Sequence, residues 1–127
     1  MEKKKREESM AKFHIVRKGK FKKNGRWSLV RRSLNLKSFG MNMVTIKPGD
    51  RIPEHDEIDR DQEEVFVVLR GRGVAVIDGE KHPVSEGTFV RVNVRPKRTV
   101  INTGKKPLEI LIVSAPRTSG YKPLGWA

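Results

Sequence analysis

After Gly40 the chain alternates between apolar and polar residues in short runs. Alternation of this kind is typical of β-strands, which turn successive side chains to opposite faces of a sheet. No segment after residue 40 keeps the 3.6-residue repeat of an amphipathic helix for ten or more residues. The pattern therefore predicts an all-β sandwich or barrel, with strands within residues 41–50, 63–71, 73–84, 87–96, 98–104 and 107–116.

Turn residues and large apolar residues refine this prediction. Asp78-Gly79 is a dipeptide that favours the type I′ turn of a β-hairpin. Met41 and Met43 alternate on one predicted strand, where they either pack in the core or line a pocket. Other large apolar residues of the runs are expected in the core rather than around a ligand: Phe66, Phe89 and Val100.

The two ends of the chain lack the strand pattern. Residues 1–12 are polar without an apolar face and are predicted to form a disordered basic arm. Residues 26–36 follow an Asn-Gly turn signal and are predicted to form an early edge strand. The predicted organisation is this arm, one barrel over residues 13–116, and a tail over residues 117–127. The tail is expected to pack on the barrel or on a partner subunit through Tyr121, Leu124 and Trp126.

Composition narrows the classes of protein that fit. The length of 127 residues suits one domain, and no apolar run reaches the roughly 20 residues of a membrane-spanning helix. The charged N-terminus lacks the apolar segment of a secretory signal, so we expect a cytoplasmic protein without a membrane partner. The absence of cysteine excludes disulfides, thiolate metal sites and cysteine nucleophiles.

The net charge of +13 is concentrated in the N-terminal third. Residues 1–37 hold 14 Lys and Arg against 3 Asp and Glu, whereas residues 38–127 hold 14 against 12. Basic residues interleaved with Phe13, Phe21 and Trp27 suit a surface that binds single-stranded nucleic acid or another acidic partner. No recognition motif accompanies them, so a solvated, solubilising surface is the favoured interpretation.

Most of the acidic residues within 38–127 lie near one histidine in the sequence. His55 is surrounded by eight carboxylates between residues 50 and 64, just before the apolar run 65–69. Most of these carboxylates suit a solvated loop, namely Asp56, Asp59, Asp61 and Glu63. The other two histidines are expected in solvent: His14 within the basic segment, and His82 after the predicted hairpin turn.

The spacing of glycines, His55 and Glu64 resembles the motifs of the cupins. Five residues separate Gly49 from His55, and six separate Glu64 from Gly71, as in the first cupin motif. The second motif is matched at Gly79, Gly87 and Asn102, with Ser85 at the position where proline is usual. The resemblance extends over roughly residues 29–116 and is strongest for small single-domain bacterial cupins. It implies a double-stranded β-helix, or jelly-roll barrel, and a homodimer to which residues 11–36 contribute.

In cupins two histidines, a glutamate and a late histidine hold a divalent metal inside the barrel. Carried over to this chain, the resemblance places His55 and Glu64 at matching positions. Glu57 replaces the second histidine, and Arg98 replaces the late one. His55, Glu57 and Glu64 could still hold Mn, Fe, Ni or Zn.

Arg98 argues against a tightly bound metal. A guanidinium cannot ligate a cation, and its permanent charge repels one. If its side chain points inward, Arg98 neutralises Glu64 or Glu57 in place of the metal. We therefore predict an internal counter-ion and no tightly bound metal, with a weak or altered metal site as the alternative.

Three functions follow from these alternatives. The favoured one is a cupin that binds a small polar or anionic molecule through His55, Glu57, Glu64 and Arg98. The second is a metal-dependent enzyme of the oxygenase or sugar isomerase type that uses the first three of these residues. The third is binding of nucleic acid or an acidic partner by the basic N-terminal segment. Whether the protein is an enzyme stays open at this point.

Overall fold

A computed structural model describes residues 12–127, so most of the predicted arm lies outside the described residues. The all-β prediction is confirmed, and the described residues include one short α-helix and one 3-10 turn. Among residues 12–127, no helix is long and apolar enough to cross a membrane. The elements are η1 (Lys18–Lys20), β1 (Lys23–Asn24), β2 (Trp27–Ser28), α2 (Val30–Leu34), β3 (Gly40–Ile46), β4 (Gln62–Arg70), β5 (Arg72–Ile77), β6 (Glu80–Ser85), β7 (Phe89–Val92), β8 (Arg98–Ile101) and β9 (Leu108–Pro116).

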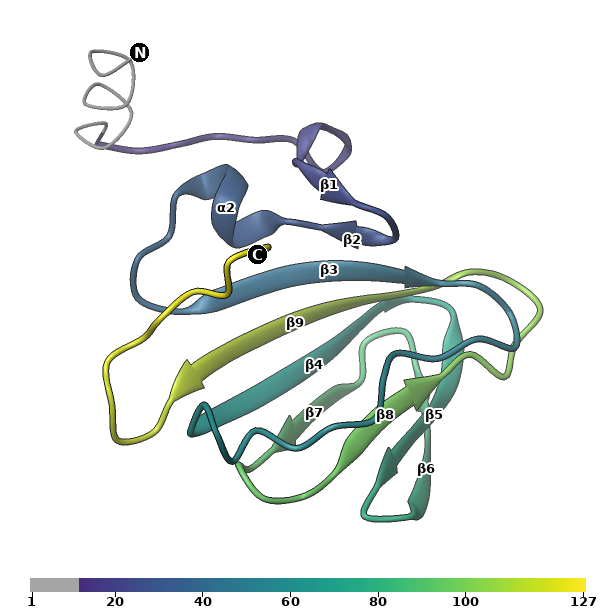
Figure 1. Cartoon of the computed structure of the whole chain (residues 1–127). Helices are drawn as coiled ribbons and strands as arrows, with labels where there is room; N and C mark the ends of the chain where they lie inside the picture. The colour runs from purple at the N-terminus through teal and green to yellow at the C-terminus, as the bar shows by residue number, and fades with distance from the viewer. Residues whose placement is uncertain (1–11) are drawn as a thin grey trace.

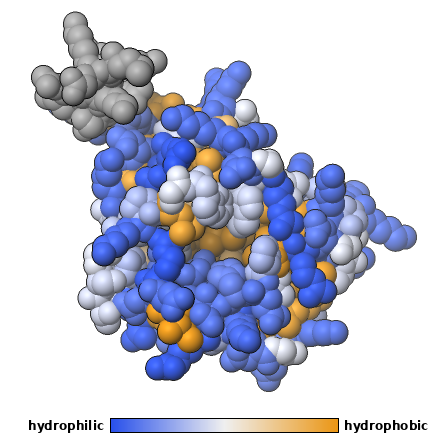
Figure 2. Space-filling view, viewed as in Figure 1, coloured by the Kyte–Doolittle hydropathy of each residue, from blue (hydrophilic) through white to orange (hydrophobic). Residues whose placement is uncertain are grey.

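The strands form two antiparallel sheets that pack as a jelly-roll barrel (Figure 1). The larger sheet has the order β1-β2-β3-β9-β4-β7, and the smaller one has the order β6-β5-β8. Their facing sides bury one core, whose members are Val44, Ile46, Ile52, Phe66, Val68, Ala75, Val84, Val92, Val100, Leu108, Ile110 and Ile112. Hydrophilic residues cover most of the face seen in Figure 2, with hydrophobic residues near its centre.

The inward face of β4 positions the site because its chemistry changes along the strand. Burial alternates with the two-residue period of a strand, so Gln62, Glu64, Phe66 and Val68 all point inward. Phe66 and Val68 belong to the apolar core, whereas Gln62 and Glu64 bring polar groups to one end of the barrel. A sequence that is apolar at one end of the strand and polar at the other thus places a polar pocket beside the core.

Two expectations for single elements are wrong. Residues 26–36 form the end of a β-hairpin and then α2 rather than one edge strand. Leu29 and Val30 are adjacent and both are buried, which a strand cannot achieve on one face but the start of a helix can. Phe89 is 71% exposed because it pairs with Val67 on the outer face of β4, opposite to the core.

Motif glycines adopt backbone conformations that other residues avoid. The φ angles of Gly49 and Gly71 are 82° and 88°, in the left-handed region. A Cβ atom at Gly71 would also lie 2.6 Å from the carbonyl oxygen of Pro107. The predicted type I′ turn is confirmed, since Asp78 and Gly79 have φ angles of 48° and 81°. These turns fix the spacing between the strands that carry the site.

The acidic segment before β4 is paired with β8 through its backbone. Ile52 N donates to Val100 O, and His55 and Arg98 exchange two hydrogen bonds of 3.1 and 2.8 Å. Glu57 N then donates to Val94 O at 3.0 Å. This pairing makes the segment an irregular edge of the smaller sheet, with His55 held at a fixed position.

Asn102 closes the end of β8 with three hydrogen bonds. It is fully buried, and its Nδ2 donates to Ile46 O and Lys106 O, each at 2.8 Å. Its Oδ1 accepts from Gly104 N at 2.9 Å. The Asn102 side chain is therefore the hydrogen-bond partner of three backbone groups, those of Ile46, Lys106 and Gly104.

We predict that Asn102→Ala lowers the free energy of unfolding by about 2–4 kcal/mol, because it leaves one buried and two partly buried backbone groups without their side-chain partner. Urea denaturation followed by circular dichroism measures this loss. Thr103→Ala, an exposed change in the same turn, serves as the control and should leave stability nearly unchanged. Equal stability of the two variants would contradict the structural role of Asn102.

Candidate ligand and metal site

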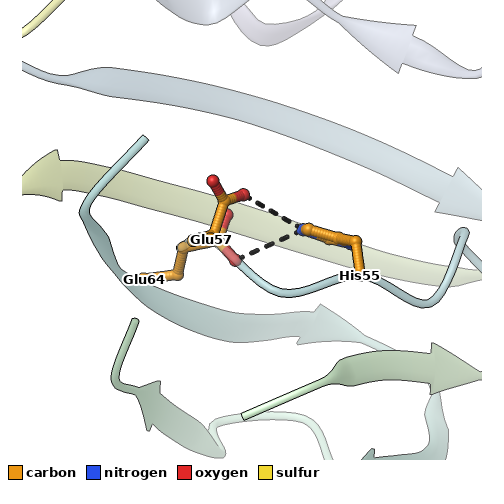
Figure 3. A group of neighbouring side chains, drawn as sticks. All are labelled: His55, Glu57 and Glu64. Carbon is orange, nitrogen blue, oxygen red and sulfur yellow. Dashed lines mark ion pairs between the residues drawn. The ribbon is translucent and has the colours of Figure 1, made fainter. Parts of the chain in front are cut away.

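A cavity of about 410 Å³ lies at the polar end of the barrel. Its walls come from the segment before β4, from strands β3, β4 and β9, and from residues 121–127 after β9. His55, Glu57 and Glu64 lie together at its wall (Figure 3). Apolar and aromatic groups supply much of the remaining surface, including Trp27, Met41, Ile52 and Ile112.

The imidazole of His55 is held by one hydrogen bond and faces two carboxylates. Nδ1 lies 2.9 Å from the carbonyl oxygen of Pro53, which can only accept, so Nδ1 carries a proton and donates. Nε2 lies 3.1 Å from Glu57 Oε1 and 3.6 Å from Glu64 Oε1 (Figure 3). An uncharged Nε2 would direct its lone pair at two anions, so this nitrogen needs a proton or a metal ion between itself and the carboxylates.

In the metal-free protein that cation is a proton. The pKa of His55 is raised from its ordinary value of 6.5 to about 10. The contact with Glu57 at 3.1 Å is the largest cause, followed by the contact with Glu64 at 3.6 Å, and together they outweigh the opposing effect of burial. His55 is therefore an imidazolium at neutral pH, and it donates from both of its nitrogens.

The side chain of Arg98 points into the barrel, which is the condition for its predicted role as an internal counter-ion. Its side chain has no exposed surface, and its Nε lies 3.4 Å from Glu64 Oε1. Nη2 donates to Asn93 O. The distance to Glu64 is that of an ion pair, but no described residue accepts a hydrogen bond from Nε or Nη1. The attraction is therefore charge-based, without the geometry of a bidentate pair.

Arg98 does not line the cavity, since it stands behind Glu64. A molecule in the cavity would meet Glu64 first and would experience Arg98 only as the charge that compensates this carboxylate. Two cations and two anions thus form one compact group, with Glu64 Oε1 next to both His55 and Arg98. The group balances its own charge before any ligand binds.

Three side chains, those of His55, Glu57 and Glu64, are placed so that they could bind one divalent cation. One ligand atom from each of His55, Glu57 and Glu64 lies within 4.8 Å of the others. Neighbouring ligands of a metal with bonds of about 2.1 Å are about 3 Å apart in octahedral geometry, near the distances from His55 Nε2 to the carboxylates. A metal would replace the proton on Nε2, while the charge of Arg98 beside Glu64 would weaken its binding.

Several other residues are placed differently from the sequence expectations or were missed by them. Met41 lines the cavity, whereas Met43 is buried elsewhere on β3. His14 and His82 do not line it. The polar wall also includes Asn42, Gln62 and Ser114, and sequence reasoning singled out none of them. The sequence could have predicted Gln62 as a site residue. It lies two residues before Glu64, so the strand period turns both side chains to the same inward face.

The model of the cupin domain family matches residues 42–114. An uncharacterised protein of Methanocaldococcus jannaschii is 35% identical over 54 residues, which are 42% of this chain and 43% of that protein. The match therefore spans less than half the length of that curated relative.

Solved structures of cupins share the fold. A cupin protein of Bacteroides fragilis superposes with a TM-score of 0.73 at 21% identity, covering 91% of this chain and 93% of that one. A sugar phosphate isomerase of the cupin superfamily from Silicibacter pomeroyi superposes with a TM-score of 0.65 at 24% identity. The match covers 70% of this chain and 57% of that one. A predicted oxalate decarboxylase of Thermotoga maritima superposes with a TM-score of 0.62 at 22% identity. The match covers 71% of this chain and 78% of that one.

We predict that His55 stays protonated well above pH 6.5, and that Glu57→Gln lowers its pKa toward that ordinary value. Because the folded-state pKa is raised, the contribution of His55 to stability is present below pH 6.5 and is lost as the pH rises toward about 10. Titration of the ring by ¹⁵N NMR measures the pKa directly.

Asp59→Asn is the matched control for this titration. Asp59 also lines the cavity, but it does not contribute to the shift at His55. This variant should leave the His55 titration where it is in the unchanged protein. A wild-type midpoint near pH 6.5 would contradict the arrangement of the two carboxylates around Nε2.

Proposed function

Because the chain belongs to the cupin family, we propose that its barrel binds a small, neutral polar molecule rich in hydroxyl groups. The cavity of about 410 Å³ suits a ligand of this size, since pockets for small molecules commonly begin near 300 Å³. The observation that carries the proposal is the convergence of one charged imidazole and two carboxylates on the cavity wall.

This group can bind hydroxyls in both of their hydrogen-bonding roles. Glu57 and Glu64 accept from hydroxyl hydrogens, while the imidazolium of His55 donates to a hydroxyl oxygen when the ligand displaces part of its contact with Glu57. Hydrogen bonds to charged groups are the stronger ones, and neutral hydroxyls can form them with little desolvation. Asn42, Gln62 and Ser114 add uncharged polar groups to the same cavity.

The charge of the cavity favours a neutral ligand over an anionic one. Its ionisable lining residues comprise four acids against two basic groups: Asp56, Glu57, Asp59 and Glu64 against His55 and Arg60. Arg98 is the residue that suggested an anion from the sequence, but its charge is directed at Glu64. Because Arg98 compensates Glu64, the other three acids exceed His55 and Arg60 by one negative charge, which an incoming carboxylate or phosphate would meet.

We predict that polyols bind and small anions do not. Isothermal titration calorimetry with D-glucose, D-xylose and myo-inositol should give saturable binding, whereas phosphate and citrate should give none. Glu57→Gln should weaken polyol binding by about 10- to 100-fold, the value of a hydrogen bond to a charged group.

Asp59→Asn, which changes a carboxylate of the cavity outside the His55 group, should change affinity much less. Tighter binding of citrate or phosphate than of any polyol would overturn the preference for neutral ligands. Binding of none of the five molecules would count against the cavity as a site for hydroxylated ligands.

A metal-dependent enzyme is the second candidate, favoured by the donor atoms of His55, Glu57 and Glu64 that lie within 4.8 Å of each other. Mn, Fe, Ni or Zn held by these residues would supply a Lewis acid, which suits sugar isomerase or oxygenase chemistry. Two cupins of similar fold are named as a sugar phosphate isomerase and a predicted oxalate decarboxylase, and these names support an enzyme as the second candidate.

We predict that the unchanged protein retains less than stoichiometric metal after incubation with each of these ions and dialysis. Arg98→His should raise retention, because it removes a positive charge beside Glu64 and adds a fourth ligand. His55→Gln should abolish it. Plasma mass spectrometry measures the metal, and circular dichroism checks that each variant is folded.

Stoichiometric metal in the unchanged protein would replace the first proposal with the second. If a folded Arg98→His variant and the double variant Glu57→His, Arg98→His both fail to take up metal, the assignment of this metal site is wrong.

A further inference from the structure

The C-terminal tail, residues 117–127, crosses back from the end of β9 toward α2 and β3 (Figure 1). On this path it supplies part of the cavity wall, through Tyr121, Leu124, Trp126 and Ala127. The ring of Trp126 contacts that of Trp27 edge-on, with centroids 5.7 Å apart and planes at 63°. Without the tail, the cavity would lose its aromatic wall on this side.

The far end of the tail is anchored to α2. Arg31 is a buried residue whose Nε donates to the backbone oxygen of Ala127 at 2.5 Å. Arg32 Nη2 donates to Gly125 O at 2.6 Å. Ala127 is itself only 4% exposed, so this end is seated in the protein rather than lying on it.

The near end of the tail is anchored to the turn before β4. Asp61 accepts hydrogen bonds from the backbone nitrogen and the hydroxyl of Thr118. These hydrogen bonds lower the pKa of the Asp61 carboxyl below its ordinary value. Arg60, which lines the cavity, donates to Lys122 O. The two anchors hold a segment that is neither strand nor helix.

Between its anchors the tail is weakly attached. Leu124 and Trp126 are 40% and 42% exposed, although both line the cavity. The tail is held mainly by side chains that donate to its backbone oxygens, and such contacts open at lower cost than a buried core or a strand ladder. The segment that completes the cavity is thus held by contacts that can separate without disturbing the core.

We propose that the tail is a specificity element of the cavity. Its aromatic side chains contact the bound ligand, and release of its anchor at Arg31 widens the access to the cavity. The first half rests on the proposed function, because it requires a ligand in the cavity. The second half concerns access and holds for any small molecule that enters.

Access can be tested without knowing the ligand. Trp27 and Trp126 are the two tryptophans of the chain, so Trp126→Phe leaves Trp27 as a single fluorescent reporter inside the cavity and keeps an aromatic ring in the tail. Acrylamide, a small neutral polar quencher, serves as the probe. In this background Arg31→Ala should raise the quenching constant of Trp27 by about twofold or more, because the tail opens more often.

Two further variants make the access test decisive. Arg17→Ala removes an exposed arginine that makes no hydrogen bond or ion pair with residues 117–127, and it should leave quenching unchanged. Asp61→Gly removes the two side-chain hydrogen bonds to Thr118 from the other anchor, and glycine tolerates the φ angle of 53° at this position. It should raise quenching in the same direction, so the test survives if Arg31→Ala fails to fold. Unchanged quenching in folded Arg31→Ala or Asp61→Gly would overturn the role of the tail in access.

Ligand contact is tested with D-glucose as the probe. Trp126→Ala should weaken its binding by about tenfold and Trp126→Phe much less, since an aromatic face is what contacts the sugar. If glucose binds equally to all three proteins, the contact is overturned while the proposed function stands. If glucose and the other polyols fail to bind but quenching rises as expected, the proposed function fails and the role of the tail in access stands.

Discussion

The backbone pairing of His55 with Arg98 is the contact on which the site depends. Two hydrogen bonds between these residues fix the acidic segment to β8, and they place an imidazole and a guanidinium 3.6 and 3.4 Å from Glu64 Oε1. Arg98 has no exposed surface and His55 is only partly exposed, so both positive charges need an opposite charge nearby. Glu64, projecting inward from β4, provides the opposite charge that both of them need.

The same arrangement determines what the site can bind. Pro53 fixes the proton on Nδ1 of His55, which leaves Nε2 facing Glu57 and Glu64. A proton or a metal ion can occupy the space between these atoms, but not both, so the two candidate functions are alternative states of one geometry. Arg98 shifts the balance toward the proton, because its permanent charge stabilises Glu64 without a metal and repels a second cation.

Much of the fold could be predicted because its signals are local. Alternation gave the six strand regions, Asp78-Gly79 gave a hairpin turn, and motif glycines gave spacings that their positive φ angles explain. The failures have local causes too. Phe89 looked like a core residue, but the register of an edge strand turned it outward. The start of α2 lay in a stretch too short to show a helical period.

The sequence by itself determined the class of fold and the identities of the four charged residues at the site, since strand periodicity and motif spacing are written along the chain. Tertiary structure alone decided that Arg98 stands behind Glu64 instead of facing the cavity. It also decided that the tail completes the cavity wall, through contacts such as that of Arg31 with Ala127, 96 residues away. Contacts across such separations depend on where the whole barrel brings the segments, and no local pattern of residues encodes that position.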